Sequence, residues 1–194
     1  NDTAYNQVIT WGIPYNIGFE SETSTEMPNS WSQFNTSSSA YAYAYESSSY
    51  AFEGTKSLKM YNGYSTSDSL IAILPSYEWA SLSDKWLSFQ AKASSSGTTV
   101  IIGVMTDPAD ATTFEAVETK TLTTAYAEYI VKLDTYTGSG KQLAFWHGNE
   151  STYSSIYLDN ISLFIPPHND AAITAFNPIT LSGSQDIIVD LKNA

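Results

Sequence analysis

Residues 85–93 read KWLSFQAKA, a stretch in which apolar and polar side chains alternate. Its apolar set includes Leu87, Phe89 and Ala91. Successive side chains of a strand point to opposite faces, so this period of two predicts a strand with one buried face. The polar run SSSG at residues 94–97 predicts a hairpin loop before the next apolar run.

The same pattern of short alternating runs between Gly, Ser, Asn and Pro recurs along the chain, and helical periodicity is scarce. We expect strands at residues 15–19, 41–45, 57–61, 70–73, 85–93, 98–106, 115–121, 127–133, 141–146 and 155–164. Ten strands in about 150 residues predict an all-β domain of two antiparallel sheets packed face to face. In the last strand, alternation predicts Ile156 and Leu158 on one face and Ile161 and Leu163 on the other.

Pro166 and Pro167 mark the end of this domain, because two prolines cannot continue a central ladder. Residues 1–165 are therefore expected to form the main domain. Residues 166–194 contain two strand-like pieces, 171–176 and 186–191, which are too short to close a sandwich alone. We expect them to form a short C-terminal β extension, either the start of a truncated immunoglobulin-like domain or an addition to the main domain's sheet.

The composition excludes several classes of function. Eight basic side chains, all lysine, stand against 20 acidic ones, for a formal net charge of -12, so nucleic-acid binding is not expected. With no Cys there is no disulfide and no thiolate metal site. Apolar runs are far shorter than the ~20 residues that span a bilayer, so membrane insertion is not expected. Abundant Ser, Thr, Tyr and Asn favour a bacterial module that is extracellular or on the outer cell surface.

Two acidic residues are candidates for binding a hard cation. Glu20 lies on the first long strand and Asp159 on the last. In a sandwich whose first and last strands pair, the two carboxylates meet, and carboxylate oxygens are ligands that calcium prefers. The alternative is that both acids cap turns or face solvent.

Three tyrosines form the candidate ligand-binding face. Tyr41, Tyr43 and Tyr45 alternate with Ala42 and Ala44, so the three rings share one face of a strand. Exposed flat rings stack on sugars or anchor protein partners. The alternative is a tyrosine cover over the sheet with no ligand.

Catalytic motifs are absent from the sequence: there is no Gly-x-Ser-x-Gly elbow, no His-Glu-x-x-His and no Gly-rich phosphate loop. A pair of carboxylates of the glycosidase type has no fixed spacing and stays open as an alternative. We expect that the chain is not an enzyme.

Several short motifs, in their order and spacing, resemble the cleaved-adhesin or choice-of-anchor J family between about residues 15 and 165. They are Phe19-Glu20, Pro28 with Trp31, residues 54–58 (GTKSL), 74–75 (LP), 87–92 (LSFQAK), 104–108 (VMTDP), Tyr136 with Gly138, 143–145 (LAF) and 156–161 (IYLDNI).

The resemblance implies a jelly-roll β-sandwich akin to MAM domains and carbohydrate-binding modules, non-catalytic and carried by large secreted or surface proteins. It also implies a structural calcium held by Glu20 and Asp159, with main-chain oxygens near Gly18, Glu53 and Lys56. The segment after the prolines is similar to the start of an immunoglobulin-like adhesion module.

We therefore expect a monomeric adhesin or binding module of a larger bacterial protein, with a host or matrix protein or a glycan as its partner. The alternatives are a carbohydrate-binding module accessory to a polysaccharide-degrading enzyme, a pure spacer domain, or a hydrolase.

Overall fold

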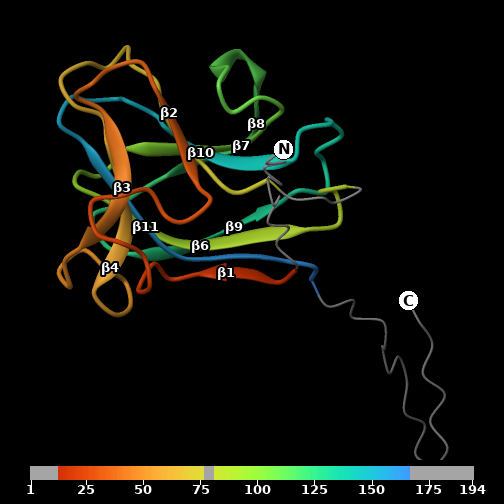
Figure 1. The fold of residues 1–194 in the computed structure, drawn as a ribbon, viewed down its shortest axis with the longest axis horizontal. Coiled ribbons are helices and arrows are strands. Elements are labelled where there is room, and N and C mark those ends of the chain that lie inside the picture. Colours follow the sequence, from red (N-terminus) through yellow and green to blue (C-terminus); the bar gives the residue numbers. More distant parts are fainter. Residues whose placement is uncertain (1–12, 77–80, 167–194) are drawn as a thin grey trace, which may run out of the picture.

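The computed structural model describes residues 13–76 and 81–166, which form eleven strands and one short 3-10 helix, η1 (Ala111–Thr113) (Figure 1). The predicted linker and immunoglobulin-like start lie outside the described residues, except for Pro166. One sheet contains, in order, β3 (Tyr41–Glu46), β4 (Lys56–Tyr61), β11 (Ser155–Phe164), β6 (Trp86–Ala93) and β9 (Ala127–Lys132), with β1 (Tyr15–Ile17) also paired to β11. The other contains β2 (Ser32–Asn35), β5 (Leu70–Ile73), β10 (Gln142–His147), β7 (Thr99–Met105) and β8 (Phe114–Thr121).

All strand pairs are antiparallel, and the architecture is the expected two-sheet jelly-roll β-sandwich. Strand β2 was not expected, because its sequence SQFN contains a single apolar residue and shows no alternation long enough to detect. No helix in the described part of the chain is long and apolar enough to cross a membrane.

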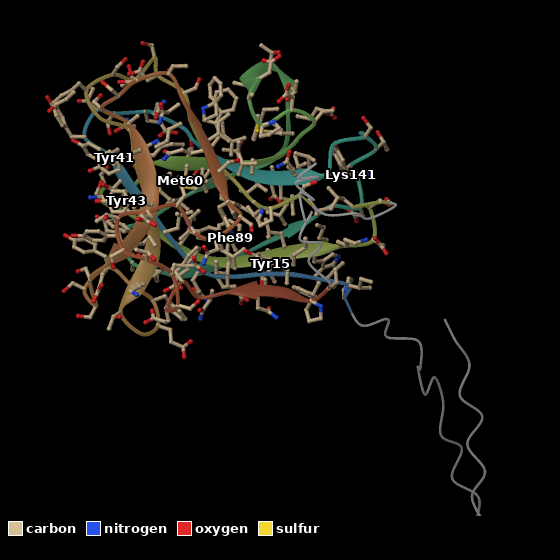
Figure 2. All side chains as sticks on the ribbon, in the orientation of Figure 1. Tyr15, Tyr41, Tyr43, Met60, Phe89 and Lys141 are labelled. Atoms are coloured by element: carbon tan, nitrogen blue, oxygen red, sulfur yellow. The ribbon has the colours of Figure 1, made fainter. Side chains whose placement is uncertain are left out.

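The core lies between the sheets and confirms the alternation in β6. Leu87, Phe89 and Ala91 are at most 1% exposed. Phe89 of one sheet meets Phe145 of the other edge to face, with ring centroids 5.1 Å apart, and Figure 2 shows Phe89 between the sheets. Fully burying a large apolar side chain contributes about 1.5–3 kcal/mol to folding, so the two rings together contribute about 3–6 kcal/mol.

The alternation predicted for β11 is wrong in its second half. Pairing with β6 shifts register between Asp159 and Ser162, and Asn160 has a φ of 43°. This β-bulge inserts one residue, so Ile161 and Leu163 point into the same core as the apolar residues before it. Asn tolerates the left-handed conformation that the bulge needs better than most residues.

The bulge is also where β11 changes partner along one edge. β4 pairs with residues 155–158 and β1 with residues 161–163. The chain leaves β1 through Phe19, which is 1% exposed and packs edge to face on Trp31, with ring centroids 6.0 Å apart. As a result, Glu20, the loop before β4 and Asp159 lie at one corner of the sheet.

The outer face of the five-stranded sheet carries a second, smaller apolar cluster. Its buried members are Ile71, Ile73, Met105 and Ala144, with Phe34, Ala111, Phe114 and Trp146 packed against them. Gly103 leaves room for the Phe114 ring, since a Cβ there would lie 2.4 Å from Phe114 Cζ. The ring then meets Trp146 edge to face, with centroids 5.0 Å apart.

Candidate binding site

The first predicted metal ligand, Glu20, bonds to the loop that leads into β4. Its Oε1 accepts hydrogen bonds from the backbone N–H of Thr55 at 2.9 Å and of Lys56 at 2.7 Å, and its Oε2 accepts one from Thr55 Oγ1 at 3.1 Å. Gly54 permits this approach, since it has a φ of +66° and a Cβ there would lie 2.4 Å from Glu20 Cδ. Burial acts to raise the pKa of Glu20, but the bonds from Lys56 and Thr55 outweigh it and lower the pKa.

The second predicted ligand, Asp159, bonds to the same loop from β11. Its Oδ2 accepts the backbone N–H of Phe52 at 2.8 Å and of Glu53 at 3.2 Å, and its Oδ1 accepts that of Asn160 at 2.8 Å. The side chain is fully buried. Burial raises the pKa of Asp159, the negative charge of Glu20 adds to the rise, and the three N–H donors offset part of it.

The other three predicted metal-site residues lie beside these carboxylates. Glu53 Oε2 accepts a hydrogen bond from Asn160 Nδ2 at 3.0 Å. Gly18 lies so close to Asn160 that a Cβ would be 3.1 Å from its Oδ1. The structure therefore brings all five predicted residues to one place. We call it the acidic corner: Gly18, Glu20, Glu53, Lys56 and Asp159.

Lys56 adds a positive charge to the acidic corner. Its Nζ donates to the carbonyl oxygens of Glu20 at 3.1 Å and Glu22 at 2.9 Å. The contacts place the N–H groups of Glu53 and Lys56 at the carboxylates, whereas the resemblance implied oxygens near them. Both carboxylates thus cap a loop, which is the alternative that the sequence left open.

The acidic corner fits calcium in the kind of its ligand atoms, which are carboxylate and carbonyl oxygens. Glu20 and Asp159 each accept three hydrogen bonds, of about four that a carboxylate can accept. Within residues 13–76 and 81–166, no three Asp, Glu or His side chains are grouped to hold a metal ion. Calcium would therefore need main-chain carbonyls and water in addition to the two carboxylates.

A pocket of about 470 Å³ lies next to the acidic corner, lined by residues 15–22 and Asn29. It contains two acids, Glu20 and Glu22. The Oε2 of Glu22 accepts the backbone N–H of Asn29 at 2.7 Å, so both acids hold the surrounding loops in place.

The predicted ligand-binding tyrosines lie together on the outer face of β3, over buried Ala42 and Ala44. Tyr41 and Tyr43 stack with ring centroids 5.0 Å apart, and Tyr43 meets Tyr45 edge to face at 6.1 Å. Figure 2 shows Tyr41 and Tyr43 side by side on β3. All three are partly exposed.

Further tyrosines from other strands extend this surface. Tyr61 lies 5.1 Å from Tyr41, and Tyr157 lies 6.2 Å from Tyr45, both between ring centroids. Tyr50, from the loop after β3, stacks on Tyr157 at 4.6 Å. Six rings from β3, β4, β11 and the loop after β3 thus form one cluster on the outer side of the sheet, in which Tyr157 is 5% exposed and the other five are at least partly exposed. We call it the tyrosine face: Tyr41, Tyr43, Tyr45, Tyr50, Tyr61 and Tyr157.

His147, at the end of β10, is fully buried in the fold. Its Nδ1 accepts the backbone N–H of Asn149 at 3.0 Å, and its Nε2 has no hydrogen-bond partner among the described residues. Burial lowers the pKa of His147 to about 4, so the side chain is neutral at physiological pH.

No protein-family model matches the chain, and no curated protein matches it either. Solved structures do. The K2 cleaved adhesin domain of Lys-gingipain aligns with a TM-score of 0.64 and 17% identity, over 79% of this chain and 99% of that one. The K1 cleaved adhesin domain of Lys-gingipain from Porphyromonas gingivalis W83 aligns with a TM-score of 0.60 and 14% identity, over 80% of this chain and 100% of that one. The CBM22-1 xylan-binding domain from Paenibacillus barcinonensis Xyn10C aligns with a TM-score of 0.52 and 15% identity, over 80% of this chain and 96% of that one. This chain therefore has the fold of the cleaved adhesin domains and of carbohydrate-binding modules.

Proposed function

We propose that this chain is a non-catalytic binding module of a larger secreted or surface protein, and that it holds a glycan on its tyrosine face. The observation that carries the proposal is the gathering of six tyrosines on the outer side of one sheet, five of them at least partly exposed and the sixth, Tyr157, buried against its neighbours. Tyr rings bring large contact area at low conformational cost, and their hydroxyls supply hydrogen bonds at the rim. The solved structures similar to this chain include adhesin domains and a xylan-binding domain, which is in keeping with such a role.

A glycan array tests this proposal, with Tyr43→Ala as the variant and Phe34→Ala as the control. Tyr43 lies between two rings of the tyrosine face, whereas Phe34 lies on the outer face of the opposite sheet. Stacking on an aromatic ring is worth about 1–3 kcal/mol in nucleic-acid complexes, so Tyr43→Ala should weaken glycan binding about tenfold or more. Phe34→Ala should leave it unchanged if the variant melts as a folded protein.

A silent array would favour the second candidate, adhesion to a host or matrix protein. This second candidate predicts that the chain captures a protein and that the binding survives glycosidase treatment of the target. Tyr43→Ala should abolish this binding. If neither glycan nor protein binds to the tyrosine face, the domain is a spacer.

A hydrolase of the glycosidase type would need two carboxylates in a cleft, and the pocket beside β1 is lined by two acids, Glu20 and Glu22. A general acid needs a raised pKa, yet the hydrogen bonds to Glu20 lower its pKa, and Glu22 is bonded to a loop N–H. These contacts favour a structural role for both acids. Turnover of any polysaccharide, abolished by Glu20→Gln, would overturn the proposal that the chain is not an enzyme.

We further propose that the acidic corner binds calcium as a structural ion, through the carboxylates of Glu20 and Asp159. Asp159 is fully buried, and no Lys or His forms an ion pair with it in the described part of the chain. Three backbone hydrogen bonds compensate part of the cost of burying the Asp159 carboxylate, and burial still raises its pKa, so part of the cost remains. A divalent ion beside Asp159 would lower that cost. For the Glu20 carbonyl oxygen to bind the ion as well, the Lys56 ammonium group, which now donates to it, would have to move away.

A thermal melt in calcium and in chelator tests the metal. At 100 times its dissociation constant, calcium would stabilise the fold by ~2.7 kcal/mol, or roughly 5 to 10 °C in Tm. Glu20→Gln should lose this shift, whereas Asp134→Asn, which changes an exposed acid on another loop, should retain it. An equal Tm in both buffers would show that hydrogen bonds and Lys56 alone hold the corner.

A further inference from the structure

Two lysines lie in register with tyrosines across the six-stranded sheet. Tyr43 of β3 pairs with Lys59 of β4, Lys59 pairs with Tyr157 of β11, and Tyr157 pairs with Lys92 of β6. Tyr126, which precedes β9, ends the row, because its ring lies 4.8 Å from Lys92 Nζ. Aromatic and cationic side chains thus alternate across the outer face of the sheet. We call this set the tyrosine–lysine row: Tyr43, Lys59, Tyr157, Lys92 and Tyr126.

The ammonium group of Lys59 is surrounded by aromatic rings. Its Nζ lies 4.8 Å from the ring centroid of Tyr45, 5.5 Å from Tyr61 and 5.8 Å from Tyr41. All three distances are within the ~6 Å over which a cation is attracted to an aromatic face. Three rings from two strands therefore hold one positive charge at the centre of the tyrosine face.

Lys92 has the same kind of environment. Its Nζ lies 4.8, 5.0 and 5.7 Å from the ring centroids of Tyr126, Tyr50 and Tyr157, and it donates to the carbonyl oxygen of Ser49 at 2.9 Å. Both lysines are partly buried, and this burial lowers the pKa of each ammonium group.

Neither ammonium has a carboxylate partner among residues 13–76 and 81–166, where the ion pairs are Lys85 with Asp84 and Lys120 with Glu118. Lys56, Lys132 and Lys141 also form no ion pair with a described carboxylate, so what distinguishes Lys59 and Lys92 is that three tyrosine rings surround each ammonium group. The two positive charges remain available to a ligand, and the rest of the acidic surface repels an anionic polymer. An anionic group that reaches this face therefore meets two ammonium groups that no described carboxylate neutralises.

We propose that the tyrosine–lysine row recognises an acidic glycan, one that carries carboxylate or sulfate groups. This inference rests on the proposed function, because it assigns a ligand class to the same tyrosine face. The partly exposed rings of Tyr43 and Tyr126 stack on the sugars, and the ammonium groups of Lys59 and Lys92 each pair with an anionic group. Their backbones are two strand spacings apart, about 10 Å, so a polymer with repeated charges engages both lysines at once.

The test uses matched pairs of polysaccharides in affinity electrophoresis or calorimetry. Dextran sulfate is compared with dextran, and polygalacturonate with its methyl ester, so each pair differs only in the anionic group. We expect the acidic member of one pair to bind at least about tenfold more tightly than its neutral counterpart, the effect of one charge-assisted contact. The pair that responds tells whether the anionic group is a sulfate or a carboxylate.

Lys59→Met and Lys92→Met test the two charges while retaining an apolar stem of similar length. Each should lower affinity for the acidic glycan about tenfold and weaken the dependence of binding on salt. Lys141→Met is the control, because Lys141 is exposed and lies far from the labelled Tyr41 and Tyr43 in Figure 2. If a Met variant fails to fold in a thermal melt, Lys59→Gln or Lys92→Gln replaces it.

The outcomes separate this inference from the proposed function. If neutral glycans bind as well as acidic ones, and Tyr43→Ala weakens them but Lys59→Met does not, the inference is wrong and the proposed function stands. If Lys141→Met weakens binding as much as Lys59→Met, the attraction is diffuse and the row is not a site. If no glycan binds, or only a protein does, the proposed function fails and this inference fails with it.

Discussion

Lowering the pH is expected to destabilise the fold through His147. Burial lowers the pKa of this side chain from 6.5 to about 4. In the unfolded chain the pKa returns to about 6.5, so between these two values the unfolded state binds one more proton and stability falls as the pH falls. Each pH unit of this interval is worth about 1.36 kcal/mol, which gives a loss of about 3 kcal/mol by pH 4 and of about 2 kcal/mol at pH 5. Above about pH 7.5 this contribution is constant, because the side chain is neutral in both states.

The structure explains why a second proton is unfavourable. Nδ1 of His147 accepts the backbone N–H of Asn149, so the single proton of the neutral ring is on Nε2. A proton added to Nδ1 would face that N–H and remove the hydrogen bond. The resulting charge would also be buried, since the side chain is 0% exposed.

Urea unfolding at intervals between pH 4 and 8 measures this effect, in the wild type and in His147→Asn. The Asn side chain has an oxygen that can accept the Asn149 N–H but does not titrate, so its profile should be flatter by about 3 kcal/mol over this range. NMR of the imidazole gives a direct check, with His168→Gln leaving one histidine signal. Identical profiles, or a midpoint near 6.5 for His147, would refute the argument.

Two glycine substitutions test the packing of the fold by thermal melts. Gly54→Ala should destabilise by about 2 kcal/mol or more and remove any calcium response, because φ is +66° and the Cβ would displace the Glu20 carboxylate; a Tm within error of the wild type would contradict the geometry of the acidic corner. Gly103→Ala should cost about 1–3 kcal/mol, because its Cβ would lie 2.4 Å from Phe114 Cζ and 2.6 Å from the Glu115 carbonyl oxygen. Gly97→Ala is the control. Gly97 also has a positive φ, but nothing lies within 4 Å of a Cβ there, so this variant measures the backbone cost of replacing glycine without a steric clash.

Sequence periodicity was sufficient to predict most of the sheet strands, because burial of one face imposes a period of two that is visible locally. It failed where the period is interrupted. The bulge at Asn160 inserts one residue into β11, and no local signal distinguishes such an insertion from continued alternation. As a result, Ile161 and Leu163 were assigned to the wrong face.

The tyrosines of β3 could be found from sequence because Tyr41, Tyr43 and Tyr45 are two residues apart on one strand. Lys59 and Lys92 could not, since they meet those rings only through the pairing order β3-β4-β11-β6. Contacts between strands depend on which strands become neighbours, and this is a property of the topology. Glu20 and Asp159 were expected to lie close together because the first and last strands pair, and β1 does pair with β11. The prediction that Glu20 lies on the first strand is wrong, because β1 ends at Ile17 and Glu20 lies in the turn that follows.

The central claim is that a ligand binds on the tyrosine face, and chemical-shift mapping tests it most directly. The glycan with the highest array signal is titrated into isotope-labelled protein, and backbone amide shifts are followed. The account predicts the largest changes in β3, β4 and β11, around Tyr43, Lys59 and Tyr157, and their loss in Tyr43→Ala. Changes confined to the five-stranded sheet or to the pocket beside β1 would contradict it.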